Sequence, residues 1–563
     1  MVSLRETGMP TRYGVFQSKA KILPITQHPP RGFLMRRYRW NHILTVCILC
    51  TLLFCTGLCS CTETQAVNSD AVSPDTDTPV SSYSDKITIK YEICKTGGGT
   101  IDGWRSQHGA TGETTKMAVT VTPKTGYVFT GWSDGNPEPT RTDVFGTENA
   151  VYVANFAFDR QELPIISITT ATGRDVTSKD EYMGAVVSMC NTGSVDYELS
   201  GVTAEIRGRG NGTWEYPKKS YRLKFERKQN LMGLGTDEHR SWILMANHAD
   251  RSMLRNYLAI DLANRLEGIG YNNNATHVAL YLNGEYRGVY LLAEQIEVDA
   301  ARVDIGTETL SDPEAEDAGF LVELDEYAEE PNRFYIDGQP FEIKSDILNE
   351  KQRRYIIGYI GDVHDAIMAG DKEALDALAD LDSFVDGYLL EEFFKNIDAG
   401  WSSFYMHKKP GEKMVFGPFW DFDLSSGNNI SLDGGAWDGI YVGRKSGMSQ
   451  EHIWYITITQ YEWFTDLVKA RWTEIQPHID DMFAELDRVA ASAPEAFERN
   501  YEVWKLQDET LWHVTDGTRN LESWQEHADY LCDWLTARRD WLTEYLASDE
   551  AYEFRKRSVR WER

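Results

Sequence analysis

Residues 255–292 read RNYLAIDLANRLEGIGYNNNATHVALYLNGEYRGVYLL and contain two different patterns. Leucines recur at the spacing of one helix face and predict a helix over residues 255–266. Residues 278–283 alternate as in a strand, and Asn283-Gly284 is a hairpin signal that leads into residues 287–292. A helix followed by a strand pair predicts an α+β domain.

The same domain extends outward from this stretch in both directions. We expect it to span residues 163–470, with strands up to residue 225 and mixed helix and strand afterwards. Residues 471–563 form a tail in which Trp, Tyr and Leu recur at helical spacing along residues 479–504 and 521–546. The tail is therefore predicted to be a pair of helices packed on the main domain.

Residues 86–158 form a separate unit, in which short alternating runs are divided by Gly-rich turns. This pattern predicts a small β module. Its centre, residues 123–135, reads PKTGYVFTGWSDG and resembles the Listeria-Bacteroides repeat, a spacer on bacterial surface proteins. We expect no catalytic residue in this module and a core that contains Tyr127, Phe129 and Trp132.

Residues 1–61 differ from the rest of the chain because they are rich in Arg and Lys. Residues 43–58 are uncharged, and the run is short for a membrane span but suits a secretion signal that starts at Met35. Leu58-Cys59-Ser60-Cys61 resembles a bacterial lipobox, which implies lipidation of Cys61. Two alternatives stay open, a cleaved signal without lipid and an uncleaved anchor.

Residues 62–85 are rich in Ser, Thr, Asp and Pro, which predicts a disordered, solvated tether. Together with the lipobox, the tether predicts a protein of the bacterial cell envelope that is held to the membrane by its lipid anchor and exposed outside the cytoplasm. The membrane is then one of its partners.

The overall composition restricts the class of protein. The chain has 563 residues, of which 57 are Lys or Arg and 87 are Asp or Glu, so the net charge is -30. Such an excess of negative charge argues against nonspecific binding of nucleic acid. A hydrophobic fraction of 42% excludes wholesale disorder. The mature chain has no CxxC pair or Cys/His spacing that suits zinc.

Residues 206–225 read IRGRGNGTWEYPKKSYRLKF and are the first candidate for chemistry. The alternating glycines allow a turn that exposes backbone N–H groups to phosphate oxygens. The strand that follows places Arg222 and Lys224 on the face opposite Tyr221. Pro217 excludes a Walker A loop. A tight hairpin with a basic surface strand is the alternative.

Three aspartates form the second candidate. Asp398 follows a predicted helix, and Asp421 and Asp423 stand in the apolar sequence Phe419-Trp420-Asp421-Phe422-Asp423. Buried carboxylates need a cation or several donors, and hard oxygen ligands suit Mg or Mn. The sequence therefore suggests a divalent metal site, unless these aspartates cap turns or pair with Arg.

A resemblance connects these segments, because the domain resembles the CotH kinase family of atypical protein kinases. The match runs from about Leu163 to beyond Asp423, with related helices afterwards, and covers more than half of the chain. Its motifs occur in the order of that family: Arg207-Gly208-Arg209-Gly210-Asn211 with Pro217-Lys218-Lys219-Ser220-Tyr221-Arg222; Ser241-Trp242-Ile243-Leu244 with Asp250, Arg251 and Leu254-Arg255-Asn256; Gly288-Val289-Tyr290-Leu291-Leu292-Ala293-Glu294; Asn396-Ile397-Asp398; and Trp420-Asp421-Phe422-Asp423.

The resemblance implies phosphoryl transfer from ATP to Ser or Thr of a protein acceptor, on a kinase-like fold and with Mg or Mn. Asp398 matches the catalytic aspartate and Asp421 matches the metal-binding aspartate, with Asp423 beside it. For the clamp on the ATP phosphates we predict Lys219, with Arg209 and Arg222 as alternates, oriented by Glu294.

The sequence departs from the pattern of the family directly after Asp398. Many relatives carry an Asn there that could help to bind metal, whereas this chain offers Ser402 and Ser403, which leaves a single-ion site open. Two other functions are considered. A noncatalytic surface adhesion or scaffold protein would fit the lipobox, tether and spacer. A metal-dependent glycosyltransferase would use Asp421 and Asp423 as its D-x-D, but the long parallel βαβ pattern of such folds is missing.

Overall fold

The computed structural model describes residues 86–94, 98–124, 127–158, 163–306, 317–443, 452–506, 511 and 513–548. The predictions for residues 1–85, namely the start at Met35, the lipid on Cys61 and the tether, lie outside the described residues. The predicted α+β class is confirmed, because an all-β region precedes a mixed domain and a helical C-terminal region.

The β module has two small sheets. Its strands are β1 (Ile87–Ile93), β2 (Gly99–Asp102), β3 (Ser106–Gly109), β4 (Val119–Pro123), β5 (Tyr127–Trp132), β6 (Thr140–Arg141) and β7 (Ala150–Phe158). They form a sheet in the order β3-β1-β7-β5 and a sheet in the order β2-β4-β6. Tyr127 and Trp132 are buried, and Phe129 packs edge-to-face on Trp132 at 5.9 Å between ring centroids. The aromatic residues thus lie in the core of the module, as the sequence predicted.

A closed barrel follows, built from β8 (Ile165–Thr170), β9 (Met183–Cys190), β10 (Leu199–Arg209), β11 (Ser220–Gln229), β12 (His239–Met245), β13 (Ala275–Leu282) and β14 (Glu285–Glu294). The strands are hydrogen-bonded in the order β10-β11-β12-β14-β13-β8-β9. Tyr221, Leu223 and Phe225 of β11 point into the barrel core. Because side chains alternate along a strand, Arg222 of β11 lies on the outer face.

The stretch that predicted the fold class forms the expected elements. Helix α1 (Arg255–Arg265) lies between β12 and β13 in the chain, close to the predicted 255–266. Asn283 and Gly284 join β13 to β14 with φ of 53° and 83°. Positive φ at both central residues is what a tight hairpin of this type requires, and Asn and Gly adopt it readily.

The second half of the domain combines a sheet with helices. Strands β15 (Phe320–Leu324), β16 (Arg333–Ile336), β17 (Gln339–Ile343), β18 (Phe404–Lys408) and β19 (Val415–Phe419) pair in the order β16-β17-β15-β18-β19. The helices are α2 (Glu350–Ala369), α3 (Lys372–Leu378), α4 (Leu381–Phe394), α5 (Ile453–Ile458) and α6 (Glu462–Glu474). Helix α4 is buried on all sides from Ser383 to Phe394, with Phe384, Phe393 and Phe394 in the main core.

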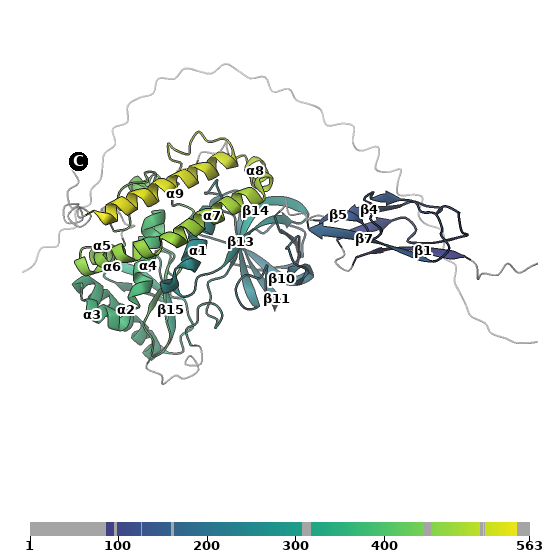
Figure 1. The fold of residues 1–563 in the computed structure, drawn as a ribbon. Coiled ribbons are helices and arrows are strands. Elements are labelled where there is room, and N and C mark those ends of the chain that lie inside the picture. The colour runs from purple at the N-terminus through teal and green to yellow at the C-terminus, as the bar shows by residue number, and fades with distance from the viewer. Residues whose placement is uncertain are drawn as a thin grey trace, which may run out of the picture. The chain divides into compact units, whose positions relative to one another are not determined.

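In its described residues the tail contains three α-helices where the sequence predicted two: α7 (Gln476–Ser492), α8 (Pro494–Val503) and α9 (Trp524–Ala547). The prediction of a single helix over residues 479–504 was wrong. Pro494 lies in the first turn of a separate helix, α8. Figure 1 shows α6 and α7 following one another along α9, and both α6 and α9 pack against α4. The tail therefore shares the main core. No helix in the described ranges is both long and apolar enough to cross a membrane.

Candidate active site

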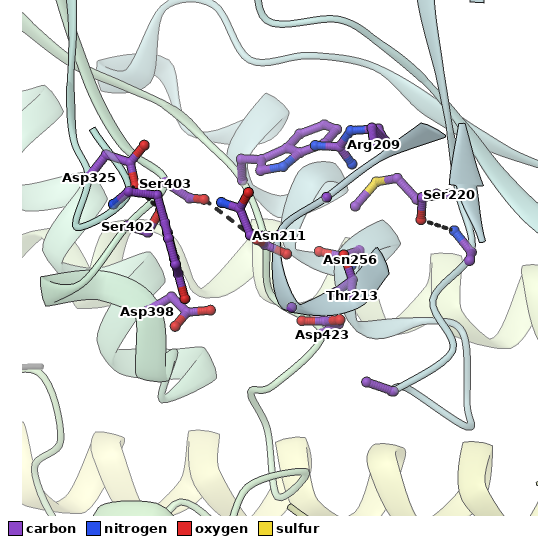
Figure 2. A pocket seen from close by; sticks show the side chains of 18 of the residues that line it. Arg209, Asn211, Thr213, Ser220, Asn256, Asp325, Asp398, Ser402, Ser403 and Asp423 are labelled. Atoms are coloured by element: carbon purple, nitrogen blue, oxygen red, sulfur yellow. Dashed lines mark hydrogen bonds between the residues drawn. The ribbon is translucent and has the colours of Figure 1, made fainter. Parts of the chain in front are cut away.

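A cavity of about 1060 Å³ opens where the barrel meets the second half of the domain. One wall comes from β10, β11 and the segment after β12, and the other from the end of β15 and the loops around Asp398 and Asp421. Figure 2 shows side chains from both walls pointing into the same space. Segments as far apart in sequence as Arg209 and Asp423 therefore contribute to one site.

Asp398 is placed by the end of helix α4. Lys395 ends the helix in the left-handed conformation, with φ of 51°, and Asn396 starts a short 3-10 turn (Ile397–Gly400). The side-chain Oδ1 of Asn396 accepts a hydrogen bond from the backbone N of Asp398 at 3.2 Å. This capped turn fixes the backbone that carries the Asp398 carboxyl group.

Asp421 and Asp423 follow β19 in a loop without regular structure. Asp421 has φ of 71°, a left-handed conformation that Asp tolerates better than most residues. The hydroxyl of Ser403 donates to Oδ2 of Asp421 at 3.5 Å, a long hydrogen bond. Asp423 is buried, with 6% of its surface exposed.

The three carboxyl groups interact electrostatically. Burial, and then the nearby Asp421, raise the pKa of Asp398 to about 7. Burial raises the pKa of Asp421, although Arg209 opposes this shift. Burial, together with Asp421, Asp398 and Asp250, raises the pKa of Asp423 well above its usual range. A bound cation would reverse these shifts, so the arrangement favours a cation site.

Two of the three predicted phosphate-binding cations line the cavity. Arg209 lies at the end of β10, with its guanidinium carbon 5.3 Å from the Trp420 ring centroid. Burial lowers the pKa of Arg209, and Asp421 opposes that shift. Arg222 lines the same cavity, and its buried Nε has no hydrogen-bond partner in the described residues. Both guanidinium groups can bind an anion in this space.

Lys219, the residue first predicted to bind the ATP phosphates, does not line the cavity. Its Nζ donates to the backbone carbonyl of Trp214 and lies 5.0 Å from the centroid of that ring. The cavity is instead lined by Lys218, Ser220 and Arg222, which alternate with Lys219 along the chain. Lys219 therefore does not join the other predicted residues.

Glu294 also lies outside the cavity lining. Its Oε2 accepts hydrogen bonds from Asn274, at 2.9 Å from the backbone N and 2.8 Å from Nδ2. Its Oε1 is 3.4 Å from Nε of Arg302, and both side chains are fully buried. Glu294 thus pairs with Arg302 rather than with Lys219, and the predicted orienting contact is replaced by a structural ion pair inside the fold.

Sequence reasoning missed several residues of the site. Glu323, Asp325 and Glu342 place carboxylate oxygens within 4.8 Å of one another on the cavity wall. Lys344 pairs with Glu323 at 3.0 Å and with Glu342 at 2.9 Å. Burial and the nearby Asp325 raise the pKa of Glu323 to about 7, although Lys344 opposes the shift.

These acidic residues engage the two serines considered as metal ligands. Ser402 Oγ donates to Asp325 at 2.8 Å, and the backbone N of Ser403 donates to Glu323 at 3.2 Å. The serines therefore connect the end of β15 to the Asp398 loop. The i, i+2 spacing of Glu323 and Asp325 was the available signal, but acidic pairs at this spacing are common on exposed strands.

Two family models match the chain. The model described as CotH kinase protein matches residues 206–542, which is more than half of the chain. The model described as divergent InlB B-repeat domain matches residues 89–160. The first match includes the barrel strands from β10, most of the cavity lining and most of the helical tail, and the second coincides with the β module. No curated protein matches the chain.

Proposed function

Because the chain belongs to the CotH kinase family, we propose that it is an atypical protein kinase that transfers the γ-phosphate of ATP to Ser or Thr of a protein acceptor. The observation that carries the proposal is the convergence of Asp398, Asp421 and Asp423 in one cavity whose opposite wall presents Arg209 and Arg222. Phosphoryl transfer needs little more than positioned acids, a divalent ion and cations for the phosphate charge.

Asp421 and Asp423 fit a divalent ion, Mg or Mn. Both supply hard carboxylate oxygens. Burial disfavours the charged form of each, and the neighbouring Asp421 adds to this effect at Asp423, until a cation compensates them. When bound, such an ion would neutralise negative charge on the β- and γ-phosphates. Arg209 and Arg222 would hold phosphate oxygens from the barrel side, since guanidinium groups bind phosphate in a bidentate manner.

Asp398 is assigned as the catalytic residue that orients the acceptor hydroxyl. Its carboxylate would accept the hydroxyl proton as the oxygen attacks the γ-phosphorus and the bond from that phosphorus to the bridging oxygen of the leaving ADP breaks. A pKa of about 7 suits this exchange near neutral pH. The 3-10 turn that begins after Asn396 holds the carboxyl group at the cavity wall.

Substitution of Asp398 tests the enzymatic proposal. With γ-labelled ATP, Mg and a protein extract that contains candidate acceptors, Asp398→Asn is expected to lower label transfer to Ser or Thr by on the order of 10³-fold while ATP still binds. The amide keeps the shape of the side chain but cannot accept the proton. Lys219→Met is the control and should keep full transfer, because the Lys219 ammonium lies outside the cavity lining. Full transfer by Asp398→Asn would contradict the assignment.

We also propose that the protein is anchored in the cell envelope through a lipid on Cys61. Support comes from the lipobox in the sequence and from the InlB-type repeat, which is of a kind found in surface proteins. Cells that express the full chain should incorporate a labelled fatty acid into it, and Cys61→Ser should remove the label. Label that survives this substitution would contradict lipidation at Cys61.

A further inference from the structure

The loop that carries two of the proposed metal ligands has a backbone that needs external support. This loop, residues 420–428, is called the acidic loop below. Asp421 and Ser426 in it have φ of 71° and 44°, in the left-handed region that side chains other than Gly seldom adopt. Such conformations persist only where neighbouring groups hold them.

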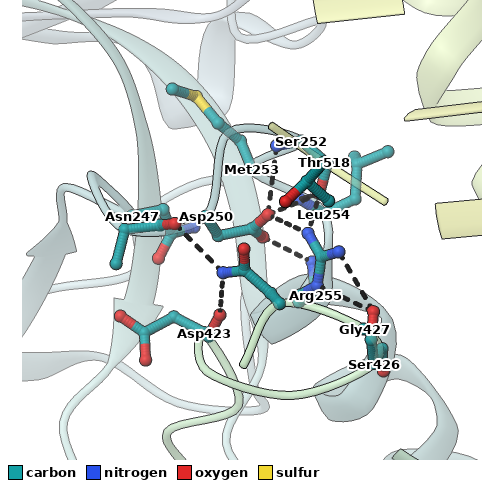
Figure 3. Close-up of polar contacts among 12 residues, drawn as sticks. Asn247, Asp250, Ser252, Met253, Leu254, Arg255, Asp423, Ser426, Gly427 and Thr518 are labelled. Carbon is teal, nitrogen blue, oxygen red and sulfur yellow. Dashed lines mark hydrogen bonds and ion pairs between the residues drawn. The ribbon is translucent and has the colours of Figure 1, made fainter. Parts of the chain in front are cut away.

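Side chains hold the backbone of the acidic loop at several places, and two of these side chains come from the start of α1. Asn256 Oδ1 accepts a hydrogen bond from the backbone N of Phe422 at 2.6 Å. Arg255 Nε donates to the carbonyl of Ser425 at 3.0 Å. Within the loop itself, Asn428 Nδ2 donates to the carbonyl of Asp423 at 2.7 Å and to that of Ala249 at 3.0 Å. Figure 3 shows how closely the start of α1 approaches this loop.

The contact of Asn256 differs from the others because it falls between the two aspartates. Phe422 is buried, and its ring packs edge-to-face on the ring of Phe394, with 5.5 Å between the ring centroids. Its side chain is thus anchored in the core, while its backbone N is held by Asn256. Asp421 and Asp423, on either side of it, both line the cavity.

The amide orientation of Asn256 is fixed by its partners. The backbone N of Phe422 can only donate, so the atom of Asn256 that faces it must be the oxygen. The amide nitrogen then donates to Oδ1 of Asn247 at 3.1 Å. Asn256 is 1% exposed and lines the cavity. It is therefore a rigid acceptor at one defined point of the acidic loop.

We propose that Asn256 is a positioning residue that sets the directions of the Asp421 and Asp423 carboxyl groups for the divalent ion. The inference rests on the proposed kinase function. Asn256 acts through the Phe422 peptide, whose orientation determines where the two flanking side chains project. Its own oxygen is occupied by Phe422, so it acts on the ion only through the aspartates.

The test measures how much Mg is needed for ATP binding. ATP is titrated by calorimetry into the full chain at a series of Mg concentrations, for the parent and for Asn256→Leu, which keeps side-chain volume but removes the acceptor. The Mg concentration for half-maximal ATP binding is expected to rise about tenfold or more, since the aspartates lose their common orientation. An unchanged Mg requirement would overturn the proposal.

Two further variants separate positioning from general destabilisation. Ser383→Ala also removes the acceptor of a buried backbone N, that of Phe416 in β19 at 3.0 Å, but Ser383 does not line the cavity. It should lower the melting temperature and leave the Mg requirement within about twofold, because the acidic loop keeps all its contacts. An equal rise of the Mg requirement in Asn256→Leu and Ser383→Ala would show that lost stability, and not lost positioning, causes the effect.

Asn256→Asp is the second variant and keeps an acceptor for Phe422. It should not raise the Mg requirement, and a rise would contradict a role for the acceptor oxygen. This variant also serves if Asn256→Leu does not fold. If the folded parent binds no ATP at any Mg concentration, the proposed kinase function fails. If the parent binds ATP and Asn256→Leu has the same Mg requirement, the positioning role alone fails.

Discussion

Asp421→Asn is expected to abolish Mg-dependent ATP binding and to lower phosphoryl transfer by on the order of 10³-fold or more. The substitution removes one negative charge from the group of carboxylates that the ion would neutralise. It also replaces an anionic ligand by a neutral amide, which binds Mg weakly. The same change removes a carboxyl group whose pKa is raised by its surroundings in spite of Arg209, so its charged form does not stabilise the fold and the melting temperature should not fall.

Asp337→Asn is a matched control for this substitution. Asp337 also has a left-handed backbone, with φ of 46°, but it lies in the turn between β16 and β17, and it does not line the cavity. The control should bind Mg and ATP as the parent does. Retained Mg-dependent binding in Asp421→Asn would contradict the assignment of this residue as a metal ligand. A folded Asp421→Asn variant with a markedly lower melting temperature would contradict the electrostatic argument.

Arg255→Met is expected to cost about 3–5 kcal/mol of unfolding free energy, the largest stability effect that we predict. Arg255 Nη1 lies 2.5 Å from Oδ1 of Asp250, and the side chains are 2% and 0% exposed. Removing the guanidinium leaves a buried carboxylate without its counter-ion. It also removes the side-chain donors to the carbonyls of Ser425 and Ser426, although the Ser425 carbonyl still accepts from the backbone N of Asn428. Denaturant unfolding followed by tryptophan fluorescence measures the loss.

A more exposed ion pair in α1 provides the comparison for the stability effect of Arg255→Met. Arg265 pairs with Asp261 at 2.8 Å, but the Arg265 side chain is 30% exposed. Arg265→Met should therefore cost no more than about 1 kcal/mol. Adding Asp250→Asn to Arg255→Met should recover part of the loss, because no unpaired anion is then left. Similar losses for Arg255→Met and Arg265→Met would show that burial does not set the strength of these pairs.

The sequence predicted the elements whose patterns are local. The helix at residues 255–266 and the Asn283-Gly284 hairpin follow from leucine spacing and from residues that accept positive φ, and neither depends on distant parts of the chain. The division of the tail before Pro494 is also a local signal, because Pro favours the first turn of a helix. The prediction of one helix over residues 479–504 rested on the longer apolar periodicity and did not take Pro494 into account.

The predicted site residues that line the cavity are also those with a local signal in the sequence. The aspartates stand out because carboxylates in an apolar run must be compensated, and the structure brings Asp398, Asp421 and Asp423 into one cavity. Arg222 follows from strand alternation, which also explains why the neighbouring Lys219 lies elsewhere. Glu294 pairs with Arg302, which belongs to a later loop. No spacing in the sequence indicates such a pairing.

Asn256 illustrates what the sequence could not supply. Its hydrogen bond joins it to Phe422, 166 residues away. A buried amide that holds a backbone group has no pattern of its own, since its neighbours in sequence do not determine its partner. Only the folded arrangement of α1 and the acidic loop reveals the contact.

Calorimetric titration of ATP into the full chain, with and without Mg or Mn, tests the central claim most directly. The account predicts binding that appears only when a divalent ion is present, because Asp421 and Asp423 would hold the ion that neutralises the nucleotide phosphates. Absence of ATP binding to the folded protein with either ion would contradict it. The same fold would then be better explained as a noncatalytic surface scaffold.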